Sequence, residues 1–242
     1  MRAVIMCAGR ATRWNGHLGV NKHQVEVDGE RIVDRTVRLL LELGVDDVWT
    51  TSDEPMPMDG THNLVASWPE IGNELTTGLE LDRFYNALPL WRGTDEFCYL
   101  YGDTYYTEEC VRLIVEAKGD FRVIGRSGPS YRTRKPYEEI FGVKLIDFDM
   151  AFEALERVYT AHRRFLFADL MKKKDVEPWT ERTACWEWYR AVEGFPLREH
   201  RIGQRFIECD DWTEDFDWPG DYERWMQQWS AYKLGCRDEP VV

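Results

Sequence analysis

The chain begins with a short apolar run that breaks into a turn of small residues. Residues 3–6 are all apolar, which is typical of a short buried strand. The turn that follows, residues 8–12, has mostly small side chains, so its backbone N–H groups can come close to a phosphate chain. Arg13 then adds a fork of donors suited to phosphate oxygens, and Lys22 adds a point charge. Taken alone, the pattern fits either a phosphate-binding loop or a strand-to-helix turn without a ligand.

The charge balance excludes some classes of partner. The chain has 242 residues, 31 of them basic and 44 acidic, for a net charge of −13. A nucleic-acid groove needs a basic surface, and so does binding to an anionic membrane. We therefore expect neither nucleic acid nor a membrane as partner, and any bound nucleotide would depend on local Arg and Lys and on a divalent cation.

The six cysteines show no Cys-x-x-Cys pairing and lie in apolar stretches. They are interpreted as free, buried thiols in a reducing compartment. The first apolar run is too short for a secretory signal, and no stretch approaches the length that spans a membrane. These features predict a cytoplasmic protein.

The opening segment resembles the signature of the nucleotidyltransferases that make sugar nucleotides and related activated molecules, of the sugar-nucleotide pyrophosphorylase and MobA-like NTP transferase type. Ala8, Gly9, Thr12, Arg13 and Lys22 match that signature, whereas Ala11 replaces its second glycine and Asn21 replaces the proline before its lysine. The resemblance implies that the nucleotide is bound by Ala8, Gly9, Arg10, Ala11, Thr12 and Arg13, and that Arg13 and Lys22 have catalytic roles.

Strand-like and helix-like patterns alternate along the rest of the chain. Strands are predicted at 45–51, 63–65, 97–101, 121–125, 137–146 and 205–209, and helices at 33–44, 107–118, over most of 149–193 and from Pro219 onward. This alternation predicts an α/β fold. The resemblance implies a Rossmann-like, mixed and mostly parallel sheet between two helical layers. The resemblance further implies the GT-A-like form of this fold, with 1–242 as one nucleotidyltransferase domain and 127–201 as an acceptor-side insertion or lid.

Gly102 and Asp103 directly follow the predicted strand at 97–101. A carboxylate at the carboxyl end of a buried parallel strand lies in the crevice where α/β sheets bind ligands. In the related family, a Gly-Asp pair at this point contributes to nucleotide binding and holds the catalytic Mg²⁺. Asp103 could instead cap the next helix, but Thr107 is a good cap and leaves Asp103 available.

The segment from Asp217 resembles the family's closing motif, in which the first residue completes the metal site. Asp217, Pro219 and Asp221 match this motif, whereas Trp218 and Gly220 do not. Asp217 is therefore the second candidate metal ligand. Two alternatives remain open, since Asp217 could cap the helix that Pro219 begins and Asp215 is a rival ligand.

Two further segments carry candidate contacts. By resemblance, Asn73 and Thr77 contact the base or ribose, although Asn73 could simply cap a helix. Residues 126–136 contain four basic side chains in an otherwise acidic protein: Arg126, Arg132, Arg134 and Lys135. This run is either a solvated loop or a lid that grips an anionic acceptor.

Together these features predict a nucleotidyltransferase that uses Mg²⁺ or Mn²⁺. It would transfer NMP from an NTP to a phosphorylated acceptor and release pyrophosphate, and the resemblance implies that this acceptor is a sugar 1-phosphate or another phosphorylated alcohol. A phosphate monoester is largely ionised at neutral pH, because its second pKa is about 6, so no general base is required. A GT-A-type glycosyltransferase and a catalytically inactive nucleotide-binding module remain alternatives, and a homodimer is left open.

Overall fold

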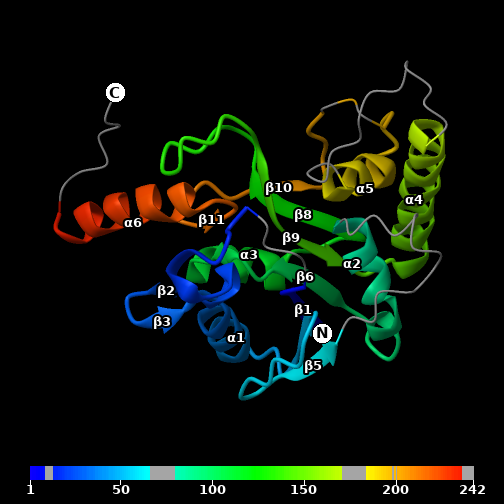
Figure 1. Ribbon diagram of the computed structural model, residues 1–242. Helices are drawn as coiled ribbons and strands as arrows, with labels where there is room; N and C mark the ends of the chain where they lie inside the picture. The colour runs from blue at the N-terminus through cyan, green and yellow to red at the C-terminus, as the bar shows by residue number, and fades with distance from the viewer. Residues whose placement is uncertain (9–12, 66–79, 171–183, 198, 200, 236–242) are drawn as a thin grey trace.

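The computed structural model describes residues 1–8, 13–65, 80–170, 184–197, 199 and 201–235. Its centre is a seven-stranded sheet with the order β10-β8-β9-β6-β1-β4-β5 (Figure 1). The strands are β1 (Arg2–Met6), β4 (Asp47–Ser52), β5 (His62–Val65), β6 (Phe97–Tyr101), β8 (Phe121–Arg126), β9 (Glu139–Leu145) and β10 (Phe206–Glu208). Only β9 runs antiparallel to its neighbours among these strands. The predicted mixed, mostly parallel sheet is confirmed.

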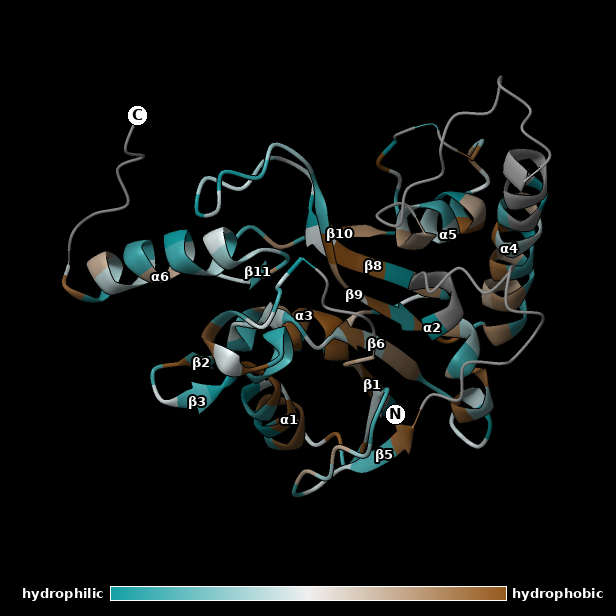
Figure 2. Cartoon of the chain, in the orientation of Figure 1, coloured by the Kyte–Doolittle hydropathy of each residue, from teal (hydrophilic) through white to brown (hydrophobic). Residues whose placement is uncertain are grey.

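Helices cover both faces of this sheet. One face packs on α1 (Ile32–Glu42) and α3 (Glu108–Glu116), whose buried side chains meet Ala3, Ile5 and Leu100. The other face packs on α2 (Glu80–Asn86), α4 (Phe148–Leu170) and α5 (Ala184–Glu193), together with the short helix η3 (Leu88–Trp91). Hydrophobic residues are concentrated in the sheet and in α3, as expected for strands buried on both faces (Figure 2). These are the three predicted α/β/α layers.

A third, mainly aromatic core lies beside the sheet. It joins the segment after β1 to the end of the chain, and its buried members are Trp14, Val25, Val27, Ile32, Tyr105, Trp212, Phe216 and Trp225. The C-terminal helix α6 (Pro219–Lys233) contributes Trp225, whose ring stacks on Trp229 at 5.2 Å between centroids. Because this core holds both ends together, it fixes the region of Arg13 and Lys22 against the region of Asp217.

The short elements near this core differ from the predictions in detail. A short hairpin of β2 (Glu26–Val27) and β3 (Glu30–Arg31) follows the short helices η1 (His17–Gly19) and η2 (Lys22–Gln24). Val45, predicted in a strand, lies before β4 because its N–H bonds to Leu40 O at 3.0 Å and closes α1, while Gly44 adopts φ 79°. A two-stranded ribbon of β7 (Thr104–Tyr105) and β11 (Glu214–Asp215) was not predicted.

No helix within the described ranges combines the length and the apolarity needed to cross a bilayer. The division of the chain into one domain with an insertion at 127–201 stays a prediction.

Candidate active site

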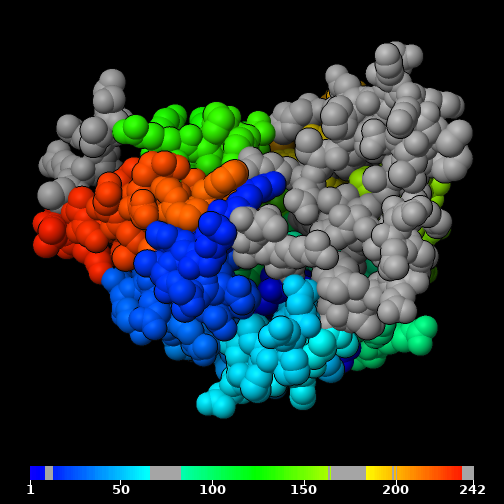
Figure 3. Space-filling model, in the orientation of Figure 1, coloured from blue at the N-terminus to red at the C-terminus, as the bar shows by residue number. Residues whose placement is uncertain are grey.

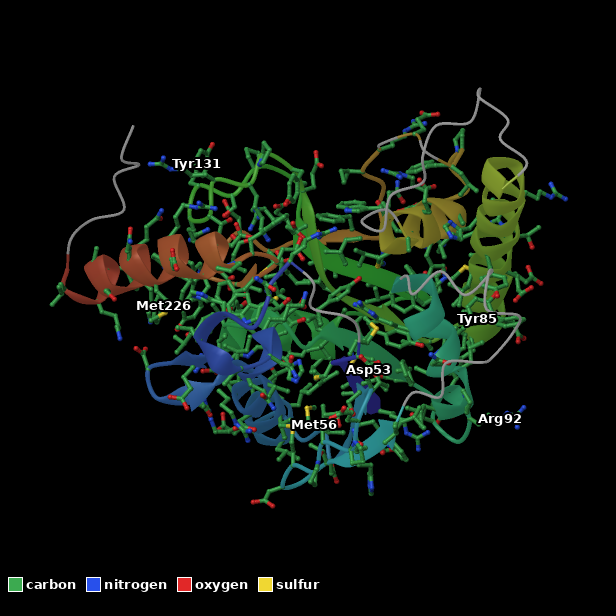
Figure 4. All side chains as sticks on the ribbon, viewed as in Figure 1. Asp53, Met56, Tyr85, Arg92, Tyr131 and Met226 are labelled. Atoms are coloured by element: carbon green, nitrogen blue, oxygen red, sulfur yellow. The ribbon has the colours of Figure 1, made fainter. Side chains whose placement is uncertain are left out.

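Three parallel strands end at the same level at one edge of the sheet. In the β-sheet register, Met6 at the end of β1 pairs with Thr51 of β4 and with Tyr101 of β6. The residues that follow these strands therefore meet, and they line a cavity of about 340 Å³. Figure 3 shows the hollow between the blue N-terminal segment and the cyan segment after β4. Asp53 and Met56 lie on its β4 side (Figure 4).

Gly102 lets two of these strand ends approach each other closely. Its N–H donates to Met6 O at 3.0 Å, and a Cβ at this position would lie 2.5 Å from Cys7 Sγ and 2.9 Å from Met6 O. Only glycine fits there without a shift of the backbone. The predicted contact of Gly102 with a nucleotide stays a prediction, but the structure gives the residue a packing role.

We expect Gly102→Ala to lower the free energy of unfolding by about 1–3 kcal/mol, because an added methyl group overpacks this contact. Urea denaturation would measure the loss. Gly128→Ala is the matched control, since a Cβ at Gly128 meets nothing within 4 Å. Equal midpoints for the two variants would show that the strand ends tolerate the extra methyl group.

Asp103 and Lys22 form a partly buried ion pair in the cavity. Burial alone would raise the pKa of Asp103, but the ammonium of Lys22 outweighs it and holds that pKa below its usual value. Burial likewise opposes the charge of Lys22, and Asp103 and Asp217 together raise its pKa. Asp103 does not cap α3, because Thr107 occupies the N-cap and accepts from Cys110 N at 3.1 Å.

Asp217 reaches the same point from the far end of the chain. The pairing of β11 with β7 places Asp215 opposite Thr104, and Phe216 N donates to Asp103 O at 2.9 Å. As a result, Asp217 Oδ1 lies 3.8 Å from Lys22 Nζ. Arg13 also contacts Asp217, with 3.2 Å between Nη1 and Oδ2. Residues from the beginning, middle and end of the chain thus meet at one ammonium group.

The two alternatives raised for the C-terminal motif can be compared with this geometry. The N-cap of α6 is Trp218, whose N–H donates to Asp221 Oδ2 at 3.1 Å, so Asp217 does not cap the helix. Asp215 contacts Lys135 instead of Lys22. Burial raises the pKa of Asp215 to about 7, against the opposing charge of Lys135. The structure therefore brings Asp217, and not Asp215, to the Asp103–Lys22 pair.

The donor set suits a hard divalent cation that also binds substrate oxygens. Two carboxylates, Asp103 and Asp217, converge on a single positive charge, the ammonium of Lys22. Mg²⁺ is often held by one or two carboxylates together with substrate phosphates. In the described part of the chain, no group of three or more His, Cys, Asp or Glu side chains could hold a metal ion by itself. These residues fit Mg²⁺ only in company with a phosphate ligand.

A second cluster of charges, the Lys135 cluster, lies next to this site. Lys135 Nζ contacts Asp215 and lies 3.5 Å from Glu139, 3.7 Å from Glu214 and 4.0 Å from Asp221. Arg126 forms a bidentate salt bridge with Glu214, with Nη1 3.0 Å from Oε2 and Nη2 3.3 Å from Oε1. Because Lys135 also donates to Asp215 O at 2.9 Å, the cluster fixes the strand that leads to Asp217.

Helix α6 holds the basic run at 126–136, which the sequence left open as a solvated loop or a lid. Arg224 Nε donates to Thr133 O, and Gln228 Nε2 donates to Arg132 O, each at 2.9 Å. Lys135 itself is buried, whereas the loop exposes Tyr131 at its tip (Figure 4). Binding of an acceptor by this region stays a prediction.

Several predicted contacts fall outside the described residues: Gly9, Arg10, Ala11, Thr12, Asn73 and Thr77. Ala8 lines the cavity, where the turn begins. Asn21, which replaces a proline of the family signature, has φ −70° and ψ 151°, within the range of φ that a proline would impose. Asn21 therefore has a backbone conformation that a proline could also adopt.

Sequence reasoning missed Arg83, which lines the cavity together with Lys22 and Asp103. It lies on α2, in a stretch with no recognised motif, so nothing in the sequence distinguished it from a surface arginine. The prediction of free, buried cysteines is confirmed for the five described ones: Cys7, Cys98, Cys110, Cys185 and Cys209.

A family model described as MobA-like NTP transferase domain matches residues 3–128, just over half of the chain. The matched segment includes β1, Lys22, α2 and the Gly102–Asp103 pair. The search of curated protein sequences found no match.

Solved structures with the same fold extend the likeness over the whole chain. A nucleotidyl transferase from Methanothermobacter has a TM-score of 0.56 at 15% identity and covers 96% of this chain and 98% of its own. A putative glucose-1-phosphate thymidylyltransferase from Bacillus anthracis has a TM-score of 0.54 at 13% identity, covering 100% and 97%. The inositol-1-phosphate CTP transferase from T. maritima has a TM-score of 0.52 at 13% identity, covering 94% and 95%. At such identities the likeness shows the fold alone.

Proposed function

The chain belongs to the MobA-like NTP transferase domain family, and from that premise we propose that it transfers NMP from an NTP to a small phosphorylated acceptor. The acceptor is a sugar 1-phosphate or another phosphorylated alcohol, and the second product is pyrophosphate. An oxygen of the acceptor phosphate attacks the α-phosphorus of the NTP. The bond from that phosphorus to the β-bridging oxygen breaks, and its electron pair leaves with pyrophosphate.

The convergence of Lys22, Asp103 and Asp217 carries this proposal. These residues lie far apart in the sequence, yet the two carboxylates share one ammonium, and Ala8 lines the same cavity as Lys22 and Asp103. A buried ion pair by itself adds little stability, because desolvation offsets the attraction. Such a group at the carboxyl ends of parallel strands suits a ligand site better than a purely structural one.

Each residue has a role that follows from its charge. The ammonium of Lys22 stabilises the negative charge that grows on the α-phosphate oxygens in the transition state. The fork of Arg13, already beside Asp217, binds the phosphate chain. The acceptor phosphate enters as an ionised nucleophile, so the site needs no base to remove a proton.

Asp103 and Asp217 would hold Mg²⁺ or Mn²⁺ together with phosphate oxygens of the NTP. When bound, this cation neutralises charge on the α-phosphate and on the leaving pyrophosphate. The pKa of Asp103 is held low enough that its carboxylate is ionised at neutral pH and ready for a cation.

The test is pyrophosphate release with each of ATP, CTP, GTP and UTP against a panel of phosphorylated acceptors, with Mg²⁺ and with EDTA. The panel includes glucose 1-phosphate and inositol 1-phosphate, the acceptors in the names of two structural relatives. We expect release with one NTP and one acceptor class only, dependent on the divalent ion, with the NDP-acceptor identified by mass.

Two outcomes would contradict the proposal. Transfer of a sugar from a finished sugar nucleotide, without pyrophosphate release, would identify a glycosyltransferase. Tight NTP binding with no turnover across the panel would identify a nucleotide-binding module that has lost catalysis.

A further inference from the structure

Arg83 on α2 is a cation whose position none of the contacts described above explains. It lines the cavity with Lys22 and Asp103. Its Nε is buried and makes no hydrogen bond within the described ranges of the chain. Ion pairs of 4.0 Å or less join Lys22 and Arg13 to carboxylates of the site, but none joins Arg83 to a described carboxylate.

A buried donor without a partner is costly, at about 1–3 kcal/mol and more for a charged group. Native proteins keep few such groups, and each calls for an explanation such as a bound ion or ligand. The Arg83 side chain nevertheless lines the cavity together with Cys7, Lys22 and Asp103. Burial has the largest influence on the pKa of Cys7, Lys22 and Asp103, and the charge of Arg83 shifts all three toward lower values.

We propose that Arg83 binds a phosphate group of the NTP, as a nucleotide-binding residue additional to Arg13 and Lys22. A guanidinium fork matches two phosphate oxygens at once, and a bound phosphate supplies the acceptor that the buried Nε lacks. This inference rests on the proposed function, because it assigns Arg83 to the substrate of that reaction.

The walls of the cavity indicate the nucleotide rather than the acceptor as the source of this phosphate. They come from the start of the turn after β1, from residues 21–24, and from residues 52–56 after β4. No described residue of 127–201, the predicted acceptor side, lines the cavity. The phosphate that meets Arg83 therefore lies on the same side as the turn that opens the chain.

Calorimetric titration of three variants tests the assignment. Arg83→Gln, Arg83→Lys and the control Arg92→Gln are each titrated with ATP, CTP, GTP and UTP in the presence of Mg²⁺, with inorganic pyrophosphate, and with the four nucleosides. Arg92 is exposed and extends away from the cavity (Figure 4).

We expect Arg83→Gln to raise the Kd of the best-bound NTP about tenfold to a hundredfold, the effect of one charge-assisted contact. Arg83→Lys keeps the positive charge but loses the paired donors of the guanidinium, so it should bind the NTP more tightly than Arg83→Gln and less tightly than the wild type. The nucleosides bind all variants equally, and in kinetics the KM for the NTP rises while the KM for the acceptor does not.

Thermal unfolding separates this role from a structural one. Without nucleotide, Arg83→Gln should unfold at the same temperature as the wild type or higher, because a buried donor without a partner has been removed. Only the stabilisation by added NTP should shrink. A lower unfolding temperature of the free variant combined with normal NTP binding would mean that Arg83 serves the fold.

The remaining outcomes are distinct. If wild type and Arg83→Gln bind the NTP equally, the assignment of Arg83 is wrong and the proposed function stands. If only the KM for the acceptor rises, the phosphate belongs to the acceptor, and the assignment to the nucleotide is overturned. If the wild type binds none of the four NTPs and no pyrophosphate, the proposed function fails, and the inference fails with it.

Discussion

Asp103→Asn is expected to reduce the rate of pyrophosphate release by about 10²–10³-fold or more, the loss typical for one group that stabilises transition-state charge. The substitution removes the carboxylate that contacts Lys22 and that would hold the divalent ion. Asparagine has the same shape, and the ammonium of Lys22 keeps Asp217 as a partner at 3.8 Å, so we expect the fold to persist. The measurement is the initial rate at saturating NTP and acceptor.

Asp95→Asn is the matched control for this variant. Asp95 is exposed and lies at the other end of β6, two residues before the strand that leads to Asp103. It should leave the rate unchanged. If Asp103→Asn kept the wild-type rate with the wild-type unfolding midpoint, Asp103 could not be part of the catalytic site.

Lys135→Met is expected to lower the free energy of unfolding by about 3–5 kcal/mol, the cost of leaving buried charges without their partner. Methionine fills a similar volume but removes the ammonium shared by Asp215, Glu139 and Glu214. Urea denaturation at pH 8 gives the measurement. Lys118→Met is the control, because Lys118 is exposed and its substitution should change stability by no more than about 0.5 kcal/mol.

The pH dependence of the Lys135→Met deficit gives an independent check. Burial, with repulsion from Asp215, raises the pKa of Glu139 well above 4.5. A group whose pKa is raised by folding favours the folded state below its unfolded pKa, and it loses that contribution as the pH rises through the folded value. Removal of Lys135 raises this pKa further. The loss of unfolding free energy in Lys135→Met should therefore be largest at pH 8 and smaller at pH 5. A loss that does not change with pH would contradict the role of Lys135 as the partner of Glu139.

Local sequence patterns were enough to predict the elements that position Asp103. The apolar run before Gly102 and the good cap at Thr107 indicated that Asp103 ends a buried strand and does not cap α3, and the structure agrees. Signals of this kind lie within a few neighbouring residues, because periodicity and capping are local properties.

Contacts between distant segments could not be predicted in the same way. The ribbon strand β11 consists of Glu214 and Asp215, which have the character of a solvated turn in the sequence but are held by Arg126 and Lys135. Arg126 precedes Glu214 by 88 residues, and Lys135 precedes Asp215 by 80. The sequence therefore did not show that these basic and acidic side chains would pair with each other. The choice between Asp215 and Asp217 likewise depended on which carboxylate faces Lys22.

The central claim is that Asp103 and Asp217 hold one divalent cation beside the nucleotide. Binding of Mn²⁺ in the presence of the NTP, followed by electron paramagnetic resonance, tests it most directly. We expect one Mn²⁺ per chain in the wild type and in Asp95→Asn. Each of the single variants Asp103→Asn and Asp217→Asn should lose that site. Binding of Mn²⁺ with wild-type affinity to either single variant would contradict it.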